Sequence, residues 1–207
     1  TQLQEQQREE YLRRLADLAR RRGELEEELF YLWQLYRQGR SELVERIAEL
    51  LRRLGRYREL AEFYAQLAEA AQGEEAAAYW TACATVYQQR LGEPERAATG
   101  FRRALEAAPQ SPAAEARLVS WQRLELERGN FQQVAELMRR RAELMPPTRR
   151  SALLSALGTL YMTRLGDPER AAAVWQEALQ VDPQRRYAAA QLVRYYENKN
   201  DYPQVVK

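Results

Sequence analysis

The side chains that most often perform catalysis or hold a metal are scarce in this sequence. Its 207 residues include no histidine, the commonest general base and metal ligand at neutral pH, and a single cysteine, Cys83. One cysteine can form neither an intrachain disulfide nor a zinc cluster. Paired carboxylates such as Glu27 and Glu28 have no companion acid, base or glycine-rich loop. We therefore expect a protein that is not an enzyme and that uses no metal or cofactor.

Arginine supplies nearly all of the positive charge, because lysine occurs only at Lys199 and Lys207. A local basic cluster consists of residues 139–141 and 149–150, on either side of two prolines. It could bind phosphate or an acidic loop of a partner, or its arginines could simply cap helix ends in solvent. The net charge of +2 argues against a nucleic-acid partner. Apolar runs of only a few residues predict no membrane insertion.

Any such binding residues must be positioned by elements of secondary structure, and in this sequence the spacing of glycines indicates where those elements lie. Gly55, Gly92, Gly129 and Gly166 recur at intervals of 37 residues. A large residue follows each glycine after nine positions, a small or aliphatic one after five, and proline follows the last three after seventeen: Tyr64, Phe101, Met138 and Trp175; Leu60, Ala97, Val134 and Ala171; Pro109, Pro146 and Pro183. Four columns at one spacing indicate an internal repeat.

Each period is typical of two helices. In residues 93–105, Ala97, Phe101, Ala104 and Leu105 fall on one face at helical spacing. Proline is favourable in the first turn of a helix and ends a helix further along, because it has no N–H to donate. The glycine closes the first helix, where a left-handed residue is needed.

The repeat resembles that of the tetratricopeptide-repeat (TPR) family. One copy fills the family pattern with Leu154, Leu157, Gly158, Tyr161, Gly166, Ala171, Trp175, Ala178 and Pro183. Another, with Trp80, Cys83 and Tyr87, fills it nearly as well, and both carry one extra residue before the glycine. A poorer copy has Gln122 and Arg141 at positions for small residues. The resemblance implies an all-α fold, an α-solenoid of stacked antiparallel helical hairpins.

The repeat predicts a packing role for the tryptophan and cysteine side chains. Tryptophans could stack on nucleic-acid bases, but Trp80, Trp121 and Trp175 occupy core columns of the repeat, so we expect them to pack. Cys83 occupies a core column as well and should be inert.

The repeat divides the chain into three regions. Residues 1–40 are expected to form an N-terminal helical hairpin that turns near Gly23, either a degenerate TPR or, with a heptad seam that includes Leu18 and Leu25, one long helix of a coiled coil that could dimerise the chain. Residues 41–183 make four TPR-like repeats. Residues 184–207 begin a further, truncated repeat. Without an initial methionine, and ending one turn into a helix that includes Tyr202 and Val205, the sequence suggests a segment of a longer protein.

In TPR arrays the first helix of each repeat lines a concave groove, and the family positions predict its lining here. The predicted groove residues are Arg13, Asp17, Glu45, Glu49, Arg52, Thr81, Thr85, Gln88, Arg123, Leu126, Thr159, Met162 and Arg194. The family's clamp for a C-terminal carboxylate is not expected, because it needs Lys and Asn, and Asp17 would repel a carboxylate. The groove is expected to be charged at one end and mildly polar to apolar in the middle.

The resemblance therefore implies a scaffold or adaptor that binds an extended peptide or a helix of another protein. A regulatory or sensor region of a larger enzyme, and a helical repeat that binds nucleic acid, are the alternatives. No basic-then-apolar signal stretch follows Thr1, from which we expect a cytoplasmic location.

Overall fold

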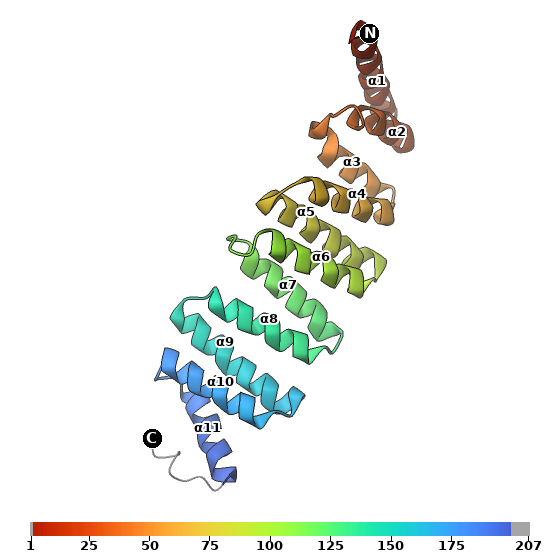
Figure 1. Ribbon diagram of the computed structural model, residues 1–207. Helices are drawn as coiled ribbons and strands as arrows, with labels where there is room; N and C mark the ends of the chain where they lie inside the picture. Colours follow the sequence, from red (N-terminus) through yellow and green to blue (C-terminus); the bar gives the residue numbers. More distant parts are fainter. Residues whose placement is uncertain (1, 200–207) are drawn as a thin grey trace.

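The computed structural model describes residues 2–199, and this part of the chain is a succession of helices packed in neighbouring pairs. The helices are α1 (Gln2–Arg22), α2 (Leu25–Tyr36), the short 3-10 helix η1 (Ser41–Leu43), α3 (Val44–Arg53), α4 (Tyr57–Ala70), α5 (Gly73–Val86), η2 (Tyr87–Leu91), α6 (Pro94–Ala107), α7 (Ala114–Glu127), α8 (Phe131–Glu143), α9 (Pro147–Leu160), η3 (Tyr161–Leu165), α10 (Pro168–Val181) and α11 (Arg186–Asn198). They stack into an elongated array with its two ends far apart (Figure 1). The predicted α-solenoid is thus confirmed.

The extra residue in two of the repeats is absorbed as a π-turn. Elements η2 and η3 are π-helical continuations of α5 and α9, and each ends at a left-handed glycine, Gly92 or Gly166, with φ of 63°. The backbone N–H of Glu93 donates to the carbonyl of Tyr87 over 3.0 Å, which closes the wider turn. The helices α3 and α7, whose repeats lack the extra residue, continue to their glycines without a π-turn. One inserted residue therefore widens a turn and leaves the hairpin intact.

The residues nine positions after each repeat glycine form the core between the helices. Tyr64, Phe101, Met138 and Trp175 are all buried, as the repeat predicts. Cys83 and Trp121 are buried too. Trp80 packs against this core as expected but is only half-buried, and the guanidinium of Arg103 lies 4.6 Å from its ring centroid.

The buried side chains separate into two clusters that meet in one hairpin. The first runs from Ala16 to Leu137, and the second runs from Val134 to Leu192. Both clusters include residues of α8: Leu137 belongs to the first, and Val134, Ala135 and Met138 belong to the second. The division between the clusters therefore runs along α8. This is the repeat whose sequence fits the family pattern least well.

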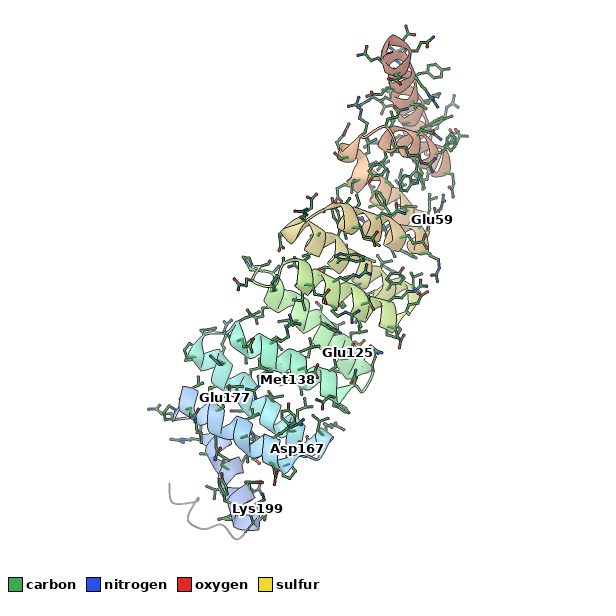
Figure 2. All side chains as sticks on the ribbon, in the orientation of Figure 1. Glu59, Glu125, Met138, Asp167, Glu177 and Lys199 are labelled. Carbon is green, nitrogen blue, oxygen red and sulfur yellow. The ribbon has the colours of Figure 1, made fainter. Side chains whose placement is uncertain are left out.

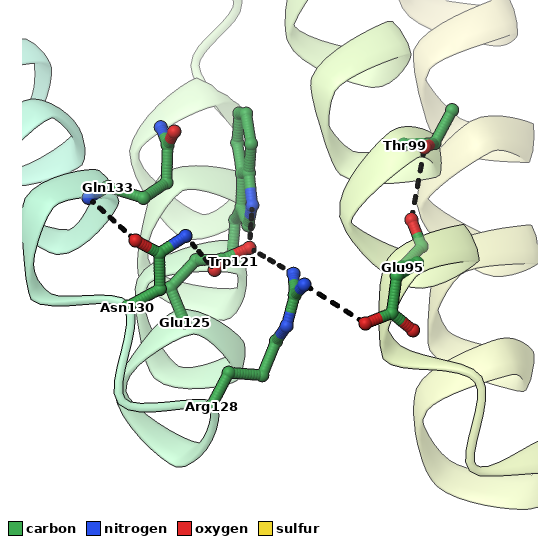
Figure 3. Close-up of polar contacts among 7 residues, drawn as sticks. All are labelled: Glu95, Thr99, Trp121, Glu125, Arg128, Asn130 and Gln133. Atoms are coloured by element: carbon green, nitrogen blue, oxygen red, sulfur yellow. Dashed lines mark hydrogen bonds and ion pairs between the residues drawn. The ribbon is translucent and has the colours of Figure 1, made fainter.

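A buried polar network lies at this junction (Figure 3). Glu125 is only 1% exposed. Its carboxylate accepts hydrogen bonds from Trp121 Nε1 and Arg128 Nη1, both over 2.9 Å, and from Asn130 Nδ2 over 3.0 Å. Arg128 Nη2 also donates to Glu95 of α6 over 3.1 Å, which connects adjacent repeats. The acceptor atoms of a buried carboxylate are thus satisfied, as burial requires.

The two ends of the array can be compared with the N-terminal and C-terminal regions expected from the sequence. The chain turns at Gly23, with φ of 74°, and α1 packs against α2, so the described structure has a hairpin here and no single long helix. Leu18, a member of the expected heptad seam, is exposed. At the other end α11 packs against α10. Tyr202 and Val205 lie outside the described residues.

Candidate functional site

A cavity of about 790 Å³ opens along the first helices of three successive repeats, α3, α5 and α7. Three of the predicted groove residues line it: Arg52, Thr81 and Thr85. The rest of the lining comes from the same helices, from η2, from the start of α7 and from one face of α4: Arg53, Tyr57, Leu60, Tyr64, Ala78, Ala82, Val86, Gln89, Arg90, Ala113, Ala116, Arg117 and Ser120.

The middle of the cavity is apolar because the helices that form it present small and aliphatic side chains. Ala82 and Val86 lie one turn apart on α5, and the buried Leu60 lies on α4. The hydroxyl of Thr81 donates to the carbonyl of Ala77 over 2.6 Å, and that of Thr85 to the carbonyl of Thr81 over 2.8 Å. Since both hydroxyl protons are used within α5, these threonines offer mainly methyl groups to a ligand.

Arg117 is held rigidly at one end of the cavity. Only 5% of this residue is exposed. Its Nη1 and Nη2 donate to the two carboxylate oxygens of Glu74, and its Nε donates to Thr81 Oγ1 over 3.2 Å. The Arg117 guanidinium, followed by the Ser111 hydroxyl, lowers the pKa of Glu74 below its usual range. Glu74 therefore stays ionised at neutral pH and fixes the orientation of Arg117.

Three further arginines lie in the lining, and tyrosines hold two of them. Arg52 Nη2 donates to the hydroxyl of Tyr64 over 3.1 Å, the main cause of the raised pKa of Arg52. The guanidinium of Arg90 lies 5.3 Å from the ring centroid of Tyr57, a cation–π contact. Arg53 is exposed. Four arginines therefore surround the apolar middle of this cavity.

A second cavity, of about 390 Å³, lies between α9 and α11. It contains one predicted groove residue, Thr159, whose hydroxyl lies 2.9 Å from the hydroxyl of Tyr187. Arg185 Nε donates to the buried Ser151 hydroxyl over 3.2 Å. This smaller space is lined by alanines as well as by polar side chains, and hydrogen bonds within the fold already engage several of its polar groups.

The other predicted groove residues line neither cavity: Arg13, Asp17, Glu45, Glu49, Gln88, Arg123, Leu126, Met162 and Arg194. Several have intramolecular partners. Arg13 lies 3.2 Å from Glu42, and Arg123 lies 3.4 Å from Glu127. Glu49 lies 2.7 Å from an Arg46 nitrogen, which lowers the pKa of its carboxyl group.

The arginine cluster around the two prolines is divided by the fold. Glu177, labelled on the ribbon in Figure 2, belongs to α10 and forms an ion pair with Arg139. Arg150 lies 3.9 Å from the same carboxylate. Arg141 points to α7, where its Nη1 donates to Gln122 Oε1 over 2.6 Å. These contacts give structural roles to much of the cluster.

Arg90 and Arg117 are cavity residues that the family positions did not predict. A signal for Arg90 exists in the repeat, because Arg164 over Phe131 reproduces the contact of Arg90 with Tyr57 two periods later, at 5.2 Å. Arg117 had no such signal, since its carboxylate partner lies in the preceding repeat, 43 residues away.

Two other kinds of site are absent from residues 2–199. This part of the chain holds no group of three or more residues suited to bind a metal ion. Nor does it contain a helix with the length and hydropathy needed to cross a membrane.

Comparison with known proteins agrees with the geometry of the array. The sequence profile of the tetratricopeptide repeat matches residues 2–180. A TPR-repeat protein of Bacteroides fragilis superposes with a TM-score of 0.60 at 11% identity, over 91% of this chain and 98% of that one. YrrB, described as a TPR protein with an unusual peptide-binding site, gives 0.45 at 16% identity over 84% and 86% of the two chains. MamA gives 0.43 at 16% identity over 77% and 88%. The sequence has no match among curated proteins. The chain belongs to the tetratricopeptide-repeat family.

Proposed function

We propose that this chain is an interaction scaffold that holds an extended segment of a partner protein in the cavity between α3, α5 and α7. The observation that carries the proposal is the cavity itself: about 790 Å³ with an apolar middle, formed by consecutive repeats. Pockets of this size with a few placed polar groups are typical binding sites. The first helices of three repeats contribute to it, so a segment that crosses them would contact all three.

An elongated ligand suits this lining better than a compact one. The cavity is lined by α3, α5 and α7, and an extended chain advances only about 3.3 Å per residue, so several residues of a partner would be needed to cross it. Thr81 and Thr85 present methyl groups, and Ala78 and Ala116 leave room for side chains of the partner. Backbone and side-chain contacts in such grooves give peptide recognition its affinity and specificity.

The test is a selection of displayed random peptides on the immobilised protein. Ala78 and Ala116 are exposed residues of the lining, so Ala78→Trp with Ala116→Trp would fill the cavity without disturbing the core. The control is Ala173→Trp, at an exposed position of α10 that lines neither cavity. We expect peptides enriched on the wild-type protein to bind the control and to lose binding to the filled variant. Equal binding to both variants would exclude the cavity as the binding surface.

A second candidate is self-association through the N-terminal hairpin. Tyr11 and Leu18 lie seven residues apart on α1 and share a face, and Phe30 of α2 is exposed as well. Exposed apolar side chains on both α1 and α2 favour contact with a second copy of the chain.

A further inference from the structure

The charges in the lining of the main cavity are all of one sign. The lining includes Arg52, Arg53, Arg90 and Arg117 but no aspartate or glutamate. Within residues 2–199, Arg53 and Arg90 have no ion pair with a carboxylate at 4.0 Å or less. A concave surface whose charged side chains are all positive concentrates an anionic ligand.

The arginines lie at opposite ends of the apolar middle. Arg52 and Arg53 are the last residues of α3, and Arg90 lies in η2, which continues α5. Arg117 lies in the first turns of α7, where it pairs with Glu74 in the first turn of α5. That pair places the start of α7 beside the start of α5, whereas Arg90 lies beyond the end of α5. Arg117 and Arg90 are therefore at opposite ends of α5. Between them are the alanine, valine and threonine side chains of the cavity.

Three of the four guanidinium groups are held in place before any ligand arrives. Arg52 is bound by the Tyr64 hydroxyl, and Arg90 lies over Tyr57. Arg117 uses three N–H groups on Glu74 and Thr81 and, of the five in a guanidinium, keeps one on each terminal nitrogen. Cations that are already ordered lose less entropy on binding than free surface arginines do.

We infer that this cavity selects an internal acidic segment of a partner, in which carboxylate side chains flank an apolar one. The inference rests on the proposed function and adds the chemistry of the occupant. Thr81, which Arg117 contacts, and Arg90 are nine residues apart along α5 and η2, an axial separation of about 13 Å. An extended chain covers this distance in about four residues. The carboxylates are therefore spaced by about four positions, and the side chains between them occupy the apolar middle.

The experiment extends the selection of displayed random peptides. Peptides enriched on the wild-type protein are sequenced, and a representative is synthesised with an acetylated amino end and an amidated carboxyl end. Its affinity is measured for the wild type, for Arg53→Gln with Arg90→Gln, and for the control Arg102→Gln, which removes an exposed arginine of α6 outside the cavity. Circular dichroism of each variant verifies the fold.

We expect enriched peptides to carry Asp or Glu at about four-residue spacing around an apolar residue. The double variant should bind the representative about tenfold more weakly, and added salt should weaken wild-type binding, whereas Arg102→Gln should have no effect.

Peptides that lose binding to the Ala78→Trp, Ala116→Trp variant but show no excess of acidic residues would overturn this inference and leave the proposed function intact. Binding that requires a free terminal carboxylate would overturn it as well. If no enriched peptide depends on the cavity, both proposals fail.

Discussion

Arg141 of α8 donates a hydrogen bond to Gln122 of α7 at the place where other repeats bring small residues against the facing helix. In the following repeat the corresponding residue is Gly158, and a Cβ atom there would lie 2.4 Å from Nε1 of Trp175. In the preceding repeat it is Ala84, close to Gly100. The polar pair therefore takes the place of a close apolar contact, and it does so where the two hydrophobic clusters meet.

This pairing predicts strong coupling between the two residues. Gln122→Ala removes the partner of Nη1 on a largely buried guanidinium and should lower the free energy of unfolding by about 1–3 kcal/mol, because a buried donor is left unsatisfied. The double variant Gln122→Ala, Arg141→Ala restores small residues at both positions and should cost less than the sum of the single changes. Urea denaturation of the four proteins measures the coupling. Additive effects would mean that the hydrogen bond contributes nothing to stability.

The buried carboxylate of Glu125 supports the same junction. Glu125→Ala would leave Trp121, Arg128 and Asn130 without their shared acceptor, and we expect a loss of about 3–5 kcal/mol in unfolding free energy. Glu125→Gln keeps one acceptor oxygen and should cost clearly less. Thermal and urea unfolding would compare the two variants. Since the hydrophobic clusters meet here, Glu125→Ala should also separate the transition into two steps, and a single shared transition with unchanged midpoint would contradict this account.

The repeat architecture could be predicted because its determinants are local and periodic. Gly92 and Gly166 mark helix ends, and Phe101 and Trp175 mark the buried face, each by residue type and spacing alone. The extra residue before the glycine was visible too, although not its conversion into a π-turn. That form depends on how the backbone closes the turn, through the hydrogen bond from Glu93 to Tyr87.

The candidate site was less accessible from the sequence, because its polar groups are organised between repeats. The contact of Arg117 with Glu74 joins different hairpins. Outside the cavity, Gln122 and Arg141 each depart from the family pattern, and only the antiparallel register of α7 and α8 within one repeat brings them together. When the sequence is compared with the family pattern one position at a time, these residues count as two separate mismatches. In the structure they are a single hydrogen-bonded pair.

The single thiol gives a prediction about pH. Burial raises the pKa of Cys83 from 9.0 to about 11, against a smaller opposing effect of Arg103. The unfolded chain therefore releases this proton at lower pH than the folded chain does. The contribution of Cys83 to stability is complete below pH 9 and declines as the pH rises towards 11, by no more than about 2–3 kcal/mol.

Denaturation of the wild type and of Cys83→Ala between neutral pH and pH 11 isolates this contribution, since the other titrating groups are common to both. The difference in unfolding free energy between them should shrink at the alkaline end. Alkylation of Cys83 by iodoacetamide should be slow in the folded protein and fast in urea. A constant difference, together with rapid alkylation of the folded protein, would show that the thiol is not protected.

The exposed residues of the N-terminal hairpin lead to the last prediction. Tyr11 is 66% exposed and Phe30 is 58% exposed, and burial of large apolar side chains of this kind between two copies would stabilise a dimer. Sedimentation velocity over a range of concentrations should show reversible association of the wild type and a monomer for Tyr11→Ser with Phe30→Ser. The control Leu144→Ser changes an exposed apolar residue at the end of α8 and should associate like the wild type. Because none of these positions is buried, all variants should keep their helicity. A wild type that stays monomeric at every concentration, or a Tyr11→Ser, Phe30→Ser variant that still associates, would rule out the hairpin as the contact surface.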